Sequence, residues 1–248
     1  MSALPRSVLA STLLRSFTIQ ASWNYRTLLG CGFAFALIPV LRTIYADRPD
    51  EYQLAVQRHT GVFNSHPYFA PMALGAVAML EASEAPEVVD RFKNAVRGSL
   101  GSLGDRLIWS GFRPLCILIA LAAVLLGAGW GLVTFGFLTL YNLGHVATRV
   151  WALRFGVAHG RKLGEELRNV PVEQLQHLMQ TAAAFFLGLV LAVTVSGHAL
   201  ESPPQVLVIA SALAAAALGA RFGGATRIPV VILMTAIALI AMMVGLLA

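Results

Sequence analysis

Apolar residues fall into runs of two different lengths along this chain. Two of the runs, 28–41 and 67–80, are only 14 residues long and contain Gly and Pro. A helix needs about 20 apolar residues to cross a bilayer, so neither run can cross alone. Non-helical backbone at membrane depth is tolerated only where protein or water covers it. The pattern predicts two re-entrant half-helices, as in transporters, or alternatively two buried hairpins with no ligand between them.

A much longer uncharged run follows. Residues 114–148 carry no formal charge over 35 positions, and as one helix they would measure about 52 Å, against a hydrocarbon core of about 30 Å. The run must tilt, break or extend, and Gly127, Gly129 and Gly131 predict a kink or a close helix contact. Further apolar runs occupy 174–200, 202–220 and 228–248. Together these runs predict about four long transmembrane helices.

The N-terminal residues 1–27 predict an amphipathic helix on the membrane surface. The first 25 residues hold Arg6 and Arg15 and no acidic residue, with apolar residues at loosely helical spacing. A cleavable signal is the alternative, but Arg15 interrupts the apolar run and no small-x-small site follows it. The most polar stretch nearby, 45–63, predicts a solvated surface helix that carries His59 as a surface residue.

Composition places the chain among multi-pass membrane proteins. Hydrophobic residues make up 57% of the sequence and charged residues 12%, with a mean hydropathy of +0.72. A soluble domain carries about 25% charged residues. The 18 Lys and Arg exceed the 12 Asp and Glu, which gives a net charge of +6. In an all-α membrane protein this excess indicates cytoplasmic loops that meet anionic lipid, and no basic-aromatic cluster indicates nucleic acid.

Basic residues also predict the topology. The segment 149–170 is rich in Lys and Arg and is expected in the cytoplasm, as is the turn between Arg221 and Arg227. This places the N-terminus in the cytoplasm and the C-terminus outside. One conflict remains, because the run 114–148 then starts outside although basic residues precede it: Arg91, Lys93, Arg97, Arg106 and Arg113. Re-entrance of 61–113 would resolve the conflict by placing these charges against protein or a cavity.

Polar residues cluster where the short apolar runs break. The candidate site residues are Asn64, His66, Glu81, Asp105 and Arg106. Ionisable groups inside a membrane protein are functional candidates. Structural roles are the alternative: Asp105 follows a Gly/Ser turn and can cap a helix over 106–112, and Glu81 or Asp105 can pair with a nearby arginine.

The sequence contains no catalytic fingerprint. HExxH, GxSxG, Walker and dinucleotide-binding motifs are absent, and the six histidines are scattered. Cys31 and Cys116 lie in apolar surroundings without a metal-binding spacing. An intramembrane hydrolase that used Asp105 and His66 would lack a nucleophile. We therefore expect no catalytic residue, no metal and no cofactor on this chain.

Four segments carry a family resemblance. They are LLRSFTIQASWNYRTLLGCGFAFALIPVL, FNSHPYFAPMALGAVAMLE, GSLGSLGDRLIWSGFRPL and YNLGHVATRVWALRFGVAHGRKLG. In this order, over roughly 13–167, they resemble the enzyme IID membrane subunits of mannose/fructose/sorbose-class sugar phosphotransferase systems. The matching features are a Ser-Trp-Asn-Tyr region, a Phe-Asn-x-His-Pro segment, a Gly-Asp turn before Arg-Pro, and a glycine-spaced helix. Two features depart from the family: Arg106 stands where better-known members more often carry Ser, and 198–204 replaces a longer Gly-rich insert.

The resemblance implies a function. Such a chain translocates a hexose across the bacterial inner membrane with a IIC membrane subunit, in a higher-order hetero-oligomer. Soluble IIA and IIB subunits carry the phosphoryl group on histidine, so this chain would be a non-catalytic subunit. The residues that would hold or gate the sugar are Asn64, His66, Glu81, Asp105 and Arg106, and Trp23 and Trp109 could stack on its ring. The alternative is a degenerate IID-like scaffold or receptor without transport.

Overall fold

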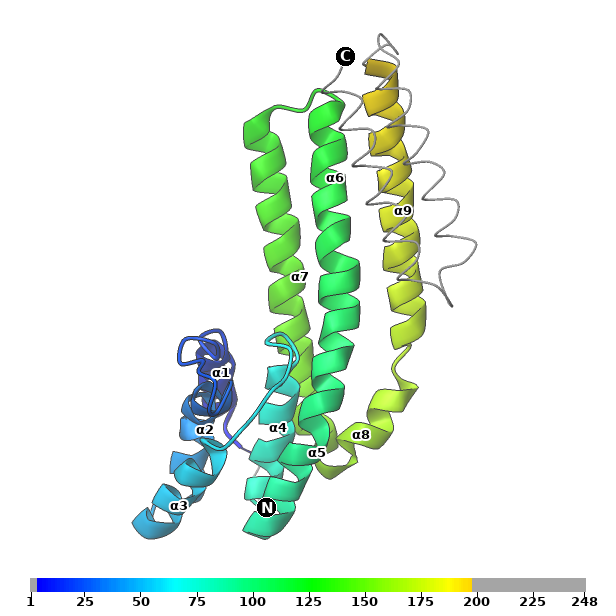
Figure 1. The fold of residues 1–248 in the computed structure, drawn as a ribbon. Coiled ribbons are helices and arrows are strands. Elements are labelled where there is room, and N and C mark those ends of the chain that lie inside the picture. The colour runs from blue at the N-terminus through cyan, green and yellow to red at the C-terminus, as the bar shows by residue number, and fades with distance from the viewer. Residues whose placement is uncertain (1–3, 198–248) are drawn as a thin grey trace. The chain divides into compact units, whose positions relative to one another are not determined.

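The computed structural model describes residues 4–197, which fold almost entirely into helices (Figure 1). The chain divides into two units, Met1–Phe186 and Leu187–Ala248, and the account below concerns the first. The elements are α1 (Arg6–Ser16), α2 (Gly30–Ile44), α3 (Pro49–His59), α4 (Ala70–Glu81), α5 (Pro86–Gly104), η1 (Asp105–Phe112), α6 (Arg113–Leu125), α7 (Trp130–His159), η2 (Gly160–Lys162), α8 (Leu163–Glu166), η3 (Leu167–Asn169) and α9 (Val172–Gly197). The expected all-α class is confirmed for this part of the chain. The predictions about 198–248, including the outside C-terminus, lie outside the described residues.

The two short apolar runs form the short helices α2 and α4, of 15 and 12 residues. Both are too short to cross a bilayer alone. Helix α4 is the centre of the core, because every residue except Met79 is buried. It packs against α2, α5 and α7. Protein therefore covers its backbone and side chains on all sides, as an uncharged segment of this length requires.

Glycines allow α4 and α7 to approach each other closely. A Cβ atom added at Gly156 of α7 would overlap the carbonyl oxygen of Met72, and one added at Gly75 of α4 would overlap that of Leu153. Small residues at such crossings let two helix backbones meet without intervening side chains. Of the two alternatives predicted for Gly127, Gly129 and Gly131, a kink or a close helix contact, the close contact is not found, since a Cβ atom added at any of them would meet no atom within 4 Å.

The uncharged run 114–148 is not one helix. Helix α6 ends at Leu125, Gly127 adopts a φ of +89°, and α7 begins at Trp130. A positive φ is strained for residues with a Cβ, so glycine allows the chain to reverse there. Helices α6 and α7 then lie side by side as a hairpin (Figure 1).

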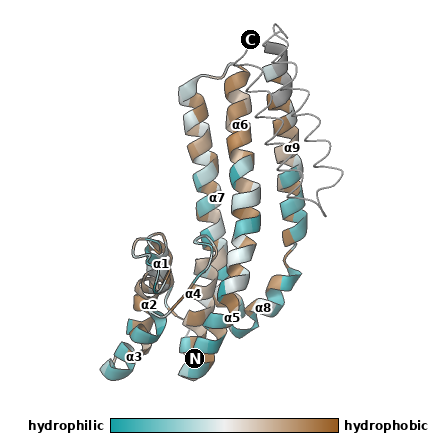
Figure 2. Ribbon diagram, in the orientation of Figure 1, coloured by the Kyte–Doolittle hydropathy of each residue, from teal (hydrophilic) through white to brown (hydrophobic). Residues whose placement is uncertain are grey.

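The hairpin brings the start and the end of the uncharged run 114–148 toward the same end of the α6–α7 pair. The start of α5 and the end of α7 lie at the same end of the hairpin, where Arg161 forms an ion pair with Glu84 at 3.4 Å. The basic residues before 114 and those of 149–170 therefore share one side. Figure 2 shows hydrophobic residues concentrated along α6 and hydrophilic ones along α3 and the start of α5. Among the described residues, Pro86–Leu125 is the one helix long and apolar enough to cross a membrane.

The predicted Gly/Ser turn before Asp105 is wrong. Helix α5 continues to Gly104, and a π-helix, η1, joins it to α6. Asp105 has helical backbone angles and makes no capping hydrogen bond, so it lies inside a continuous helix. Glycine destabilises a helix by only about 1 kcal/mol relative to alanine, and here the packing of α5 against its neighbours outweighs that loss. π-Helical turns are rare and frequently occur at functional sites.

One N-terminal prediction, the surface position of His59, needs correction. The polar stretch forms α3, with Asp50 and Glu51 in its first turn as a helix start favours, but His59 at its end is fully buried. His59 is therefore not a surface residue. Helix α1 covers only 11 residues of 1–27, and it buries Thr12 and Ser16 while Leu14 stays 69% exposed. Its protein-facing side therefore combines these two hydroxyl groups with Val8 and Leu13, which pack against the core.

The α4–α7 crossing predicts an asymmetric response to alanine. Gly156→Ala should destabilise the protein by about 1–3 kcal/mol, because overpacking against the Met72 carbonyl exceeds the gain in helix propensity. The matched change Gly136→Ala on the same helix meets no atom within 4 Å and should be neutral or slightly stabilising. Thermal unfolding of both variants in detergent measures the difference. Equal midpoints would show that the close approach is unimportant.

Candidate functional site

A cavity of about 260 Å³ lies where the segment before α4 faces η1. It is lined by Gln20, Trp23, Leu29, Asn64, Ser65, His66, Pro67, Gly101, Asp105 and Trp109. Three of the five predicted site residues, Asn64, His66 and Asp105, therefore come together with Trp23 and Trp109, the two tryptophans that could stack on a sugar ring. Glu81 and Arg106 lie elsewhere. Residues 64–67 and 105–109 are far apart in sequence, so the packing of α4 against α5 creates this site.

His66 lines this cavity and carries an unused hydrogen-bond donor. The residue is 3% exposed, and its Nδ1 atom accepts a hydrogen bond from the backbone N–H of Tyr68 at 3.2 Å. Burial lowers the pKa of His66 to about 4, although Asp105 opposes this effect, so the ring is neutral at pH 7. The proton of a neutral ring with an accepting Nδ1 resides on Nε2. That atom is buried and has no hydrogen-bond partner.

The other polar groups of the cavity are open to a ligand. The side chains of Asn64 and Asp105 are exposed, and no hydrogen bond or ion pair to another described residue engages them. Trp109 packs edge-on against His66 with ring centroids 5.7 Å apart and remains 58% exposed. The cavity thus combines a donor, a carboxylate acceptor, an amide and an aromatic face. This combination can bind an uncharged molecule with several hydroxyl groups.

A buried basic layer lies behind His66. Arg149 of α7 is 2% exposed and donates to the carbonyl oxygen of Ser16 at 2.6 Å and to Nε2 of His145 at 2.6 Å. The His145 ring stacks on Tyr68 at 3.9 Å, and Tyr68 is the residue that fixes Nδ1 of His66. Sequence reasoning placed Arg149 in a solvated cytoplasmic segment. The spacing of His145 and Arg149, four residues apart on one helix face, was the available signal.

Glu81 belongs to a buried polar cluster outside the cavity. Its carboxylate accepts hydrogen bonds from Tyr45, Arg58 and His59, each at 2.7 Å. Lys93 extends the cluster by donating to the carbonyl oxygen of Arg58 at 2.8 Å. These contacts join the end of α2, α3, α4 and α5. The arrangement corresponds to the structural alternative, in which Glu81 pairs with an arginine, although with Arg58, which the sequence did not suggest.

The protonation states in this cluster follow from opposing effects. Burial by itself raises the pKa of Glu81, but the hydrogen bonds from His59, Arg58 and Tyr45 lower it to about 2. Burial lowers the pKa of His59, against the opposing hydrogen bond to Glu81. His59 is therefore neutral and donates its Nε2 proton to an ionised Glu81. His59 Nδ1 and Arg58 Nε stay buried without partners.

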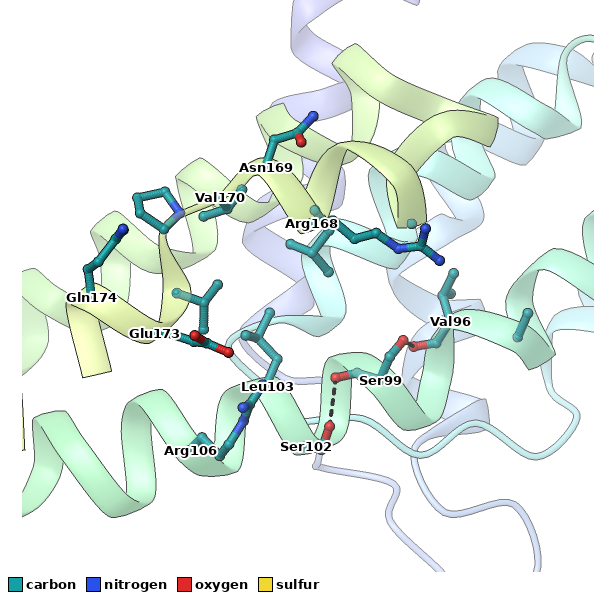
Figure 3. A pocket seen from close by; sticks show the side chains of 15 residues that line it. Val96, Ser99, Ser102, Leu103, Arg106, Arg168, Asn169, Val170, Glu173 and Gln174 are labelled. Carbon is teal, nitrogen blue, oxygen red and sulfur yellow. Dashed lines mark hydrogen bonds between the residues drawn. The ribbon is translucent and has the colours of Figure 1, made fainter. Parts of the chain in front are cut away.

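Arg106 faces a separate, larger cavity of about 830 Å³, together with Arg168, Glu173 and Gln174 (Figure 3). Asp105 and Arg106 are neighbours in η1, yet they line different cavities.

Among residues 4–197 no group of three His, Cys, Asp or Glu side chains is arranged to hold a metal ion.

Comparisons with known proteins agree on one family. Residues 3–213 match the family model described as the PTS system mannose/fructose/sorbose family IID component. The chain is 28% identical to the PTS system mannose-specific EIID component of Escherichia coli K12 over 75% of its length, and 23% identical to the fructose permease IID component of Bacillus subtilis over 75%. These matches cover 67% and 68% of the relatives. The cryoEM structure of the mannose transporter ManYZ and microcin E492 complex contains a similar chain, with 25% identity, a TM-score of 0.60, and coverage of 77% of this chain and 71% of that one.

The Glu81 cluster predicts a large effect of one neutral substitution. Glu81→Gln should destabilise the protein by about 3–5 kcal/mol, because it leaves Arg58 without its buried partner. The matched change Glu51→Gln removes an exposed ion pair with Arg48. The side chain of Glu51 is 53% exposed and that of Arg48 is 49% exposed, so this change should lower the free energy of unfolding by only about 0–1 kcal/mol.

The pH dependence gives a second readout of the same variant. Because the folded pKa of Glu81 is lowered, its contribution to stability is complete above pH 4.5 and is lost as the pH falls to about 2. His59, whose folded pKa is also lowered, stabilises fully above pH 6.5 and progressively less below it. Wild-type unfolding midpoints should therefore fall on acidification, and Glu81→Gln should lack the step below pH 4.5. An unchanged acid profile would contradict the assigned role of Glu81.

Proposed function

Because this chain belongs to the mannose/fructose/sorbose family of phosphotransferase IID components, we propose that it is a sugar-translocating subunit. It is a membrane protein, as the relatives of this family are. In the proposed function it works with a IIC membrane subunit in the bacterial inner membrane. Soluble IIA and IIB subunits phosphorylate the hexose as it arrives. This chain supplies binding and passage, and the phosphoryl chemistry takes place on the soluble subunits.

The observation that carries this proposal is the cavity of Asn64, His66 and Asp105. A hexose has several hydroxyl groups that each donate and accept, so its binding site needs fixed partners of both kinds. His66 Nε2 donates, Asp105 accepts, and Asn64 does both. Trp23 and Trp109, which are 47% and 58% exposed, offer flat apolar surfaces to the C–H face of a sugar ring. An uncharged sugar requires no cation or metal in such a site.

The exposure of the cavity supports a partner subunit. Asn64, Asp105 and Trp109 are open on one side, and a sugar bound there would still contact water or lipid. Translocation needs a closed passage, because polar groups cannot face hydrocarbon. A second membrane subunit over this side would complete the enclosure. We assign this position to the IIC subunit.

The departure at Arg106 does not favour the scaffold alternative. Arg106 lines the larger cavity of about 830 Å³. The presence of Arg at position 106, where other family members more often carry Ser, therefore leaves the groups around Asn64 and His66 unaltered. The complete set of polar groups favours transport over a degenerate role.

Sugar uptake tests the proposed function. In cells that co-express the IIC, IIA and IIB subunits, Asp105→Asn should lower uptake at least tenfold, since a lost hydrogen bond to a charged group costs about 1.5–3 kcal/mol. His66→Gln removes a neutral donor, worth about 0.5–1.5 kcal/mol, and should lower uptake about two- to tenfold. The control Asp47→Asn changes an exposed aspartate outside both cavities and should transport like wild type. Co-purification with IIC measures assembly in parallel. Normal uptake by Asp105→Asn would refute the assignment of the cavity.

The hairpin predicts the membrane orientation. The turn after α6 should lie outside and the basic segment after α7 in the cytoplasm, because Lys and Arg favour the cytoplasmic side. A reporter that is active only outside should work when fused after Ala128 and fail when fused after Asn169. The reverse pattern would invert the proposed topology, including the cytoplasmic N-terminus.

A further inference from the structure

The cavity that contains Arg106 has two arginines in its wall, and neither forms an ion pair within residues 4–197. Arg106 enters it from η1 and Arg168 from η3, on the opposite side (Figure 3). No ion pair or hydrogen bond within residues 4–197 engages either guanidinium group. Ser99 and Ser102 also line the cavity, but their hydroxyl groups donate to helix carbonyls. The free donors are thus the two arginines and the amide of Gln174.

One acidic residue shares this wall. Glu173 lies in the first turn of α9, where a helix N-terminus stabilises negative charge. Its carboxylate forms no ion pair with Arg106 or Arg168. The longest ion pair among the described residues, between Arg161 and Glu84, has an N–O distance of 3.4 Å. Two arginines and one glutamate leave a net positive cavity. A ligand with a single negative charge complements that balance.

A second, apolar cavity adjoins the first. It has a volume of about 460 Å³, and it shares Leu103, Val170 and Val172 with the basic cavity. Its wall consists of large apolar side chains from four elements, among them Phe69, Leu107, Phe112, Trp151, Leu175 and Met179. Thr148 supplies a hydroxyl group, but that group donates to the Gly144 carbonyl of its own helix at 2.7 Å. The cavity therefore favours a hydrocarbon occupant.

We propose that the two adjoining cavities form one binding site for an anionic phospholipid. The phosphate and headgroup would occupy the basic cavity, and the start of an acyl chain would enter the apolar one. Both volumes lie within the range of about 300–1,000 Å³ that is usual for ligand sites. A membrane protein is exposed to such lipids permanently, and basic pockets between helices at the cytoplasmic side are suited to their headgroups.

Arginine is suited to this ligand. Its planar guanidinium group forms paired hydrogen bonds to phosphate oxygens, and it stays charged at any physiological pH. Phosphatidylcholine carries a compensating cation, which would meet Arg106 and Arg168 with like charge. Phosphatidylglycerol carries none. The site therefore distinguishes lipids by net charge, while the apolar cavity distinguishes a lipid from a free phosphate ion.

Lipid retention by the purified complex tests this site without reference to sugar transport. The full-length chain is isolated with its membrane partner in mild detergent, delipidated, and mixed with dioleoyl-phosphatidylglycerol, dioleoyl-phosphatidylcholine or inorganic phosphate. Native mass spectrometry then counts bound lipid. Wild type should retain phosphatidylglycerol well above phosphatidylcholine, and phosphate should not displace it.

Substitutions divide the two halves of the site. Arg106→Gln with Arg168→Gln should lower phosphatidylglycerol retention at least tenfold, as expected for lost charge-assisted hydrogen bonds. Arg91→Gln, an exposed arginine of α5 outside the cavity, should have no effect. Glu173→Gln should raise retention. Thr148→Phe should fill the apolar half and lower retention, whereas Thr134→Phe on an exposed face of the same helix should not.

Several outcomes would overturn the proposal. Equal retention of the two lipids by wild type, or no response to the double arginine variant, would exclude a charge-selective site. Displacement by phosphate together with unchanged retention in Thr148→Phe would identify an anion site without a lipid. If the double variant fails to assemble, the opposite responses to Glu173→Gln and Thr148→Phe still decide the question.

Discussion

The close approach of α4 and α7 is the constraint on which the rest of this structure depends. Gly75 and Gly156 let the two backbones meet, and no side chain separates them there. This contact sets the position of Tyr68, just before α4, against His145 and Arg149 of α7. Tyr68 in turn fixes the tautomer of His66 through its backbone N–H. The polarity of the candidate sugar cavity is therefore a consequence of helix packing on the far side of α4.

The opposite end of α4 is held by charge. Glu81 draws three donors from α2 and α3 into the protein, and each donor would be costly to bury alone. Helix α4 is thus fastened by steric fit near its middle and by hydrogen bonds at its C-terminal end. A short helix that is supported at both places holds the segment 64–67 in a fixed position. Binding groups that must stay ordered in a translocating protein benefit from such support.

Much of the fold and part of the site could be predicted from sequence. The short helices α2 and α4 followed from run length, and Asn64, His66 and Asp105 followed from their place beside the breaks. The interruption at Gly127 was one of two predicted alternatives, a kink or a close helix contact, and the sequence did not show that the chain reverses there, because an uncharged run of 35 residues is compatible with one long helix or with two. His59 was misplaced because its own neighbours are polar, and its partner Glu81 lies 22 residues away. A contact between residues so far apart in the sequence does not change the local pattern of polar and apolar residues.

The number of residues in η1, the π-helix between α5 and α6, determines which residues line each of the two cavities. Asp105 and Arg106 are adjacent, yet one faces the candidate sugar cavity and the other the basic cavity. Loss of one residue from η1 would turn everything before it by about 100° relative to α6, which is the rotation per residue of an α-helix. That rotation would carry the carboxylate away from His66 and alter what Arg106 meets. A substitution in 105–112 alters the cavity that its own side chain lines, but an insertion or deletion there would alter both cavities at once.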